Sequence, residues 1–115
     1  MMKYYYNLYI SEPLLAKKQE ILEKLRQGKL QVNRYLIVLA KNQKNHLEFF
    51  DSAFLKQKQT DKDELFVVGI ADGCDGALEL VEKITQDVYD KTKGTDIRNY
   101  LLEQQREFEE RVKHV

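Results

Sequence analysis

The sequence has little of what marks secreted or membrane-spanning proteins. It contains one cysteine, Cys74, one proline and no tryptophan. A single cysteine cannot form an internal disulfide, and small secreted domains usually need several, so we expect a reducing, cytoplasmic location. The longest apolar runs, residues 35–40 and 65–71, are far shorter than the roughly 18 residues of a membrane-spanning helix. Residues 1–10 also lack the apolar segment of a signal peptide. We therefore expect no contact with a membrane.

Residues that bind metals and nucleotides are scarce as well. The only histidines are His46 and His114, so neither the C-x-x-C nor the H-x-x-x-H spacing of a zinc site occurs. The phosphate-binding patterns G-x-G-x-x-G and G-x-x-x-x-G-K-[ST] are missing too. The sequence therefore predicts no metal, no cofactor and no convergent set of catalytic residues.

The charges that are present balance over the whole chain but not along it. Residues 1–62 hold 12 Lys or Arg against 6 Asp or Glu, whereas residues 63–115 hold 7 against 13. One explanation is that the two halves face each other, within a monomer or across a dimer. The other is that a basic face binds an anionic partner and an acidic face binds something else. We favour the first explanation.

The apolar pattern predicts a single α+β domain over residues 1–115, in the order β-α-β-β-β-α-α. Strands are predicted at residues 3–10, 35–40, 46–55 and 65–71, with the second and third forming an antiparallel hairpin. A first helix begins with Ser11 as its cap and stops at Gly28, and a second follows residues 72–76 and stops at Gly94. A last helix begins at about residue 95, at Thr95 or Asp96.

These elements predict a four-stranded mixed sheet with three helices. A right-handed crossover would set the first two strands parallel, and strands two to four would form a meander. In the last helix, Tyr100, Leu101, Phe108 and Val112 make a stripe, although charged residues surround Phe108. We expect this helix to project and to dock on a second copy of the chain, which predicts a homodimer. Packing back onto its own sheet is the competing outcome, and another protein partner is an alternative.

The best-placed candidate ligand site is the segment Asp72, Gly73, Cys74, Asp75 and Gly76, which joins a buried strand to a helix. Open α/β sheets commonly bind ligands at such a position, and a helix N-terminus favours anions. The two aspartates would repel a bare phosphate unless a divalent ion lay between them. The alternative, which we favour, is that Asp72 or Asp75 caps the helix while the glycines relieve backbone strain.

Cys74 lies in the same segment, where the helix dipole can lower the pKa of a thiol. As a nucleophile it would need a nearby base. His114 lies in a charged tail, and nothing in the spacing brings His46 close to Cys74. Any chemical role for this cysteine stays open.

Tyrosines and lysines in the first half raise the question of nucleic-acid binding. Base-stacking rings and phosphate contacts would come from Tyr4, Tyr5, Tyr6, Tyr9, Lys3, Lys41, Lys44, Lys56, Lys58 and Lys62. However, the isoelectric point is only about 6.7, and no known nucleic-acid-binding motif is present. Because tyrosines in a strand are usually half-buried packing residues, we expect no nucleic-acid partner.

Several segments resemble a family of small uncharacterised bacterial proteins. They include His46-Leu47-Glu48-Phe49-Phe50-Asp51-Ser52 and Phe66-Val67-Val68-Gly69-Ile70-Ala71-Asp72-Gly73. The resemblance runs almost end to end and implies a bacterial, cytoplasmic, stand-alone protein without supplying an activity. Our first hypothesis is a small non-enzymatic interaction or regulatory protein. The rival hypothesis is a small enzyme or ligand-binding protein that uses residues 72–76, and a third is weak nucleic-acid binding through the basic half.

Overall fold

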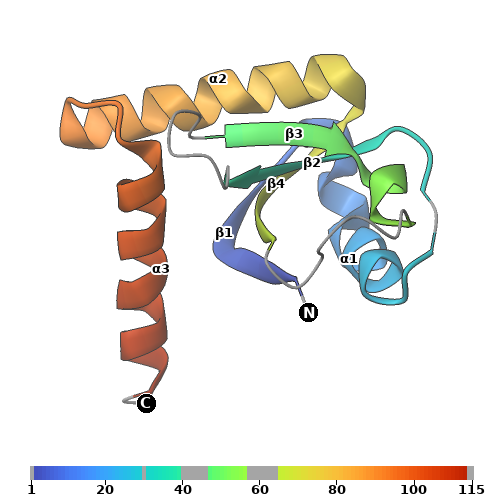
Figure 1. The fold of residues 1–115 in the computed structure, drawn as a ribbon, viewed down its shortest axis with the longest axis horizontal. Helices are drawn as coiled ribbons and strands as arrows, with labels where there is room; N and C mark the ends of the chain where they lie inside the picture. Colours follow the sequence, from blue (N-terminus) through green and yellow to red (C-terminus); the bar gives the residue numbers. More distant parts are fainter. Residues whose placement is uncertain (1, 30, 40–46, 57–64, 114–115) are drawn as a thin grey trace.

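A four-stranded mixed sheet lies at the centre of the protein, with α2 above it and α1 below it in Figure 1. The computed structural model describes residues 2–29, 31–39, 47–56 and 65–113. The strands are β1 (Lys3–Ile10), β2 (Arg34–Leu39), β3 (Leu47–Asp51) and β4 (Phe66–Asp72). The helices are α1 (Lys18–Arg26), α2 (Gly73–Thr92) and α3 (Ile97–Lys113), with short 3-10 helices η1 (Glu12–Lys17) and η2 (Ser52–Lys56). The predicted α+β class and element order are confirmed.

The uninterrupted apolar strands are buried on both faces, as predicted. In β2, Leu36 and Val38 pack toward α1, whereas Ile37 and Leu39 pack toward α2. Side chains alternate between the two faces of a strand, so a strand covered on both sides has no position for a polar residue. The sheet therefore separates two apolar cores, one under each helical layer.

The predicted strand arrangement is wrong, although the hairpin of β2 and β3 is confirmed. The sheet order is β1-β4-β2-β3, with β1 parallel to β4 and antiparallel pairing elsewhere. The chain leaves the sheet at Ser11, whose N–H bonds the Ile70 carbonyl, and returns at Arg34, which lies opposite Asp72. Because η1 and α1 start and finish at the same end of β4, β2 runs antiparallel to β1 and the crossover does not form.

Gly69 lies where both neighbours of β4, the strands β1 and β2, approach it closely, so a side chain does not fit there. A Cβ at this position would lie 3.2 Å from the Ile37 Cδ1 and 3.2 Å from the Tyr9 carbonyl oxygen. The registers of β4 with both β1 and β2 shift in this region. The irregularity lets Val68 and Ala71 face α2 while Val67 and Ile70 face α1.

Two predicted helix ends differ in detail from the structure. Ser11 precedes η1, but its side chain makes no capping hydrogen bond to that helix. The second helix stops at Thr92, and the left-handed residue that ends it is Lys93, with φ of 58°, rather than Gly94. Gly28 does end α1, since its φ of 73° is the left-handed conformation that glycine adopts without strain.

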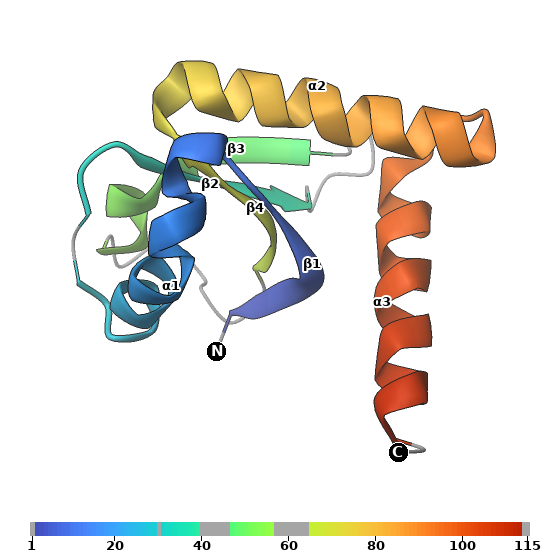
Figure 2. The same cartoon turned by 180° about the vertical axis from the view of Figure 1, so that it is seen from behind.

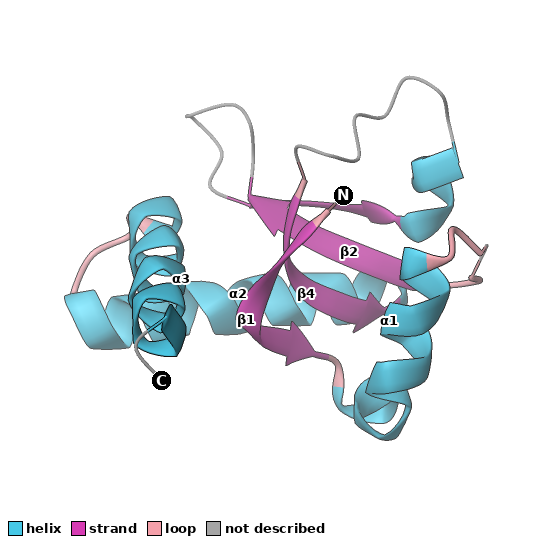
Figure 3. Cartoon of the chain, turned by 90° about the horizontal axis from the view of Figure 1, so that it is seen from below, coloured by secondary structure: helices cyan, strands magenta, loops and turns pink. Residues whose placement is uncertain are grey.

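The last helix leaves the end of α2 in a new direction and runs beside the edge strand β1 (Figures 2 and 3). Ile97 and Leu101 are buried, and the ring of Phe108 stacks on Tyr6 with centroids 4.5 Å apart. Phe108 therefore packs on the protein's own sheet, the outcome that competes with docking on a second copy, because β1 supplies an aromatic partner. Val112 remains 54% exposed. Within the described residues, no helix is long and apolar enough to cross a membrane.

Candidate functional site

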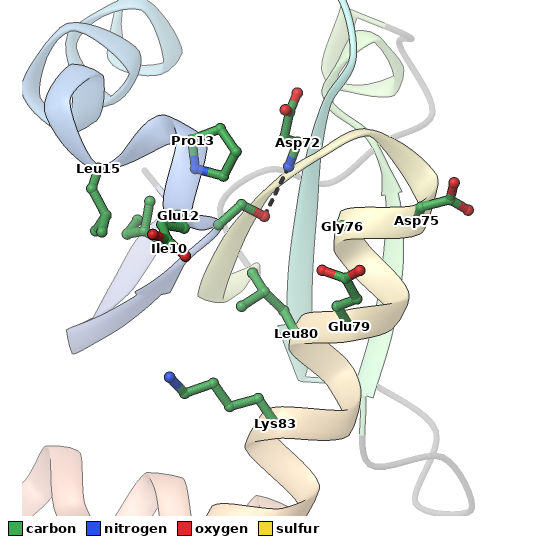
Figure 4. Close-up of a pocket in the computed structure, with 11 residues that line it drawn as sticks. Ile10, Glu12, Pro13, Leu15, Asp72, Asp75, Gly76, Glu79, Leu80 and Lys83 are labelled. Atoms are coloured by element: carbon green, nitrogen blue, oxygen red, sulfur yellow. Dashed lines mark hydrogen bonds between the residues drawn. The ribbon is translucent and has the colours of Figure 1, made fainter.

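A crevice of about 650 Å³ lies where β1 and β4 end side by side (Figure 4). The two strands are parallel neighbours, but the chain that follows β1 packs on one face of the sheet and α2 packs on the other. Open sheets leave a space at such a point, because the two connections diverge and neither fills the gap between them. One wall of this crevice is therefore η1, and the other is the first part of α2.

Ser11 joins the two walls. Its hydroxyl oxygen accepts a hydrogen bond of 3.0 Å from the Asp72 backbone N–H, and its own N–H donates to the Ile70 carbonyl. The residue is only 8% exposed. A Cβ on Gly76 would lie 3.1 Å from this hydroxyl oxygen, so the lack of a side chain there lets α2 approach. The start of η1 and the start of α2 are thus held at a fixed separation.

The crevice has an apolar floor and a charged rim. Ile10, Leu15 and Leu80 contribute apolar surface. In Figure 4, Leu80 and Lys83 extend from α2 toward η1, while Glu79 lies along α2. The opposite wall, η1, contributes Glu12. Acidic side chains outnumber the lysine on the rim, so the local field favours a positively charged ligand.

Only part of the predicted site reaches this crevice. Asp72, Asp75 and Gly76 line it, whereas Gly73 and Cys74 do not belong to its lining. Asp75 points away to the far side of α2 in Figure 4. The single cysteine is exposed at the start of the helix.

The favoured prediction, in which Asp72 or Asp75 caps α2 and the glycines relieve backbone strain, needs one correction. Asp72 stands at the N-cap position of α2, but its side chain makes no capping hydrogen bond. One Asp72 carboxylate oxygen lies 3.5 Å from a guanidinium nitrogen of Arg34 instead, since the two residues are opposite each other on β4 and β2. Strain relief is confirmed at Gly73, whose φ of 76° is a left-handed conformation.

Sequence reasoning missed the opposite wall and the later turns of α2. Ser11 and Glu12 follow β1 as residues 72–76 follow β4, so the parallel pairing of the two strands would have shown that both segments meet. Glu79 and Lys83 lie four residues apart on α2, the spacing of a single helix face. Without the pairing, nothing distinguished that face from an ordinary solvated surface.

The other predicted chemistries gain no support from the described residues. Among residues 2–29, 31–39, 47–56 and 65–113, no group of three His, Cys, Asp or Glu side chains is placed to hold a metal ion. His46 and His114 lie outside these ranges, as do Lys41, Lys44, Lys58 and Lys62. The Cys–His pairing and the basic nucleic-acid surface therefore stay hypotheses.

Tyr5, Tyr6 and Tyr9 of β1 pack on the side of the sheet that faces α2, whereas Tyr4 packs on the side that faces α1. Tyr5 is 5% exposed, and the Tyr9 hydroxyl donates a hydrogen bond of 2.8 Å to an Asp87 carboxylate oxygen. Burial raises the pKa of Tyr5 and of Tyr9 above the ordinary value of 10.0, and the Asp87 carboxylate raises that of Tyr9 further. Neutral, hydrogen-bonded rings of this kind suit a core.

Comparisons of the chain with protein-family models, with curated proteins and with solved structures found no match. The geometry described above is therefore the only basis for a functional proposal.

Proposed function

We propose that the protein is a small, non-enzymatic binding protein whose ligand occupies the crevice between η1 and α2. The observation that supports this most is the position of the crevice, at the ends of two parallel strands whose connections diverge. Its volume of about 650 Å³ is within the range of small-molecule sites.

The side chains around the crevice favour an organic cation with a short aliphatic part. A protonated amine between Glu12 and Glu79 would donate charge-assisted hydrogen bonds to a carboxylate on each wall. Its methylene groups would lie on Leu80 and Ile10. Lys83 at the end of the rim disfavours a ligand that carries a second ammonium close by.

The described lining supports binding rather than catalysis. Its only serine, Ser11, is buried, and its hydroxyl oxygen already accepts the Asp72 N–H. A nucleophilic hydroxyl needs a base within hydrogen-bond reach and access to the substrate, and burial removes the second of these. We propose a structural role for this hydroxyl.

Calorimetric titration with n-butylamine and spermidine tests the proposal. We expect saturable binding of n-butylamine, weaker binding of spermidine and a flat isotherm with Mg²⁺, because the carboxylates come from separate walls and do not form a metal cage. Glu79→Gln should weaken amine binding about tenfold, since one charged hydrogen bond is lost. Glu82→Gln is the matched control, as Glu82 is exposed on α2 and does not line the crevice. Flat isotherms with both amines, or equal losses in the two variants, would refute this function.

We further propose that the protein forms a homodimer in the bacterial cytoplasm. Exposed apolar side chains on and beside α3 support self-association, since Val112 is 54%, Tyr89 48% and Leu102 39% exposed. The single free cysteine supports the location. Light scattering on the full chain at tens of micromolar tests the dimer, and a monomeric mass would refute it.

A further inference from the structure

The connection between α2 and α3 contains a strained residue beside a permissive one. Lys93 adopts φ of 58° and ψ of 23°, a left-handed conformation that its Cβ disfavours. Gly94 follows it and tolerates almost any backbone conformation. A rotation at these two residues releases the strain, and it leaves the start of α3 intact because an Asp96 carboxylate oxygen accepts the Asn99 N–H. The connection therefore has the properties of a hinge.

The helix α3 is held by the core that lies under α2 and by the edge strand β1. Ile97 and Leu101 are its buried residues, and Phe108 stacks on Tyr6 with an interplanar angle of 6°. The Gln105 side-chain oxygen accepts a hydrogen bond of 2.8 Å from the Tyr6 backbone N–H. None of these contacts requires that helix and strand belong to the same chain, so the α3 of a second copy satisfies all of them equally well.

The middle of β1, which α3 covers, is poorly suited to contact with solvent. The register of β1 with β4 passes from Tyr4 opposite Val67 to Tyr9 opposite Gly69, so the residues between have no matching partners in β4. Withdrawal of α3 would leave the Tyr6 N–H without its acceptor and would uncover an aromatic edge strand. Open edges of this kind pair readily with another chain. Another helix would then have to cover β1, and the α3 of a second copy can make the contacts described above.

We propose that two copies of the chain exchange α3, so that the helix of each copy docks on β1 of the other. Exchange of an identical element between protomers is a low-cost route to a dimer, because it makes no new kind of contact. The inference rests on the proposed homodimer and gives it a mechanism. It assigns Lys93 and Gly94 as the hinge and the arched middle of β1 as the docking surface.

Two single-cysteine variants test the exchange directly. Both carry Cys74→Ser, because the exposed native thiol would otherwise cross-link. Tyr6→Cys and Phe108→Cys chains are refolded together at high concentration and oxidised. A disulfide between the two chains is expected, since only exchange brings these positions from different copies together. The matched control replaces Tyr6→Cys with Lys17→Cys, an exposed position at the end of η1, and should cross-link far less.

Light scattering on the unmodified chain separates the two proposals and covers the case in which a cysteine variant fails to fold. Lys93→Gly, which fits the left-handed position, should favour the closed monomer and lower the dimer fraction roughly fivefold or more. A dimeric mass without the specific disulfide, or a dimer unaffected by Lys93→Gly, would refute exchange while self-association stands. A monomer at tens of micromolar would refute both.

Discussion

Replacing Gly76 with alanine measures how tightly η1 and α2 are joined at the crevice. In an open helix position alanine is favoured over glycine by about 1 kcal/mol. Here the new Cβ would lie 3.1 Å from the Ser11 hydroxyl oxygen, which the Asp72 N–H holds in place at 3.0 Å. Crowding into a packed site costs about 1–3 kcal/mol, so we expect Gly76→Ala to lower the free energy of unfolding by about 1 kcal/mol.

The same substitution should stabilise the protein once the hydroxyl is removed. Ser11→Ala alone leaves the Asp72 N–H without its partner and should cost about 1–3 kcal/mol. In that background the nearest remaining atoms to a Cβ on Gly76 are those of Ala71 and Asp72 at 3.8 Å, an ordinary contact. Gly76→Ala should then gain its full helix preference of about 1 kcal/mol, so the two substitutions couple by about 2 kcal/mol.

Urea unfolding followed by circular dichroism gives the four free energies of this cycle. Substitutions that do not interact add within about 0.5 kcal/mol. An equal effect of Gly76→Ala in both backgrounds, within that margin, would show that the contact with Ser11 is absent. The separation of the crevice walls would then need another explanation.

Two further predictions concern the sheet. Gly69→Ala should destabilise the protein by about 1–3 kcal/mol in urea unfolding, because its Cβ would meet Ile37 and the Tyr9 carbonyl oxygen at 3.2 Å, and an unchanged midpoint would contradict the squeezed geometry. The raised pKa values of Tyr5 and Tyr9 favour the neutral rings in the folded state, so their stabilisation is complete below the ordinary pKa of 10.0 and is lost as pH rises above it. Tyr9→Phe should reduce that loss in alkaline unfolding titrations, and an identical pH dependence would count against the hydrogen bond to Asp87.

Local sequence patterns predicted the elements well because each element satisfies a local rule. The run 35–40 has no polar residue, and the strand formed there is buried on both faces. Gly28 ends a helix because its backbone adopts a left-handed conformation there. In both cases the deciding interactions lie within a few residues of each other in the chain, where a single sequence displays them.

The contacts between segments that are distant in the sequence were not predictable. They account for the errors in the strand order and in the candidate site, and they decide where Phe108 packs. Inserting β4 between β1 and β2 leaves every local apolar pattern unchanged, so the meander and the observed order fit the sequence equally well. Half of the crevice was found through residues 72–76, and the half at Ser11 and Glu12 was missed for this reason. Packing of Phe108 on the protein's own sheet was only the competing outcome, because its charged neighbours are visible in the sequence, whereas its partner Tyr6 lies at the other end of the chain.

The strand β1 contributes to both the crevice and the surface that contacts α3, but different parts of the strand do so. Its middle arches away from the register of β4 and presents Tyr6 to α3. Beyond the arch, Tyr9 and Ile10 pair again with Gly69 and Ile70, and this renewed ladder holds the end of the strand that leads into the crevice. Movement of α3 therefore acts on residues that β4 does not hold, while the crevice wall stays fixed by backbone hydrogen bonds. A ligand in the crevice and an exchanged helix can for this reason be tested independently on one chain.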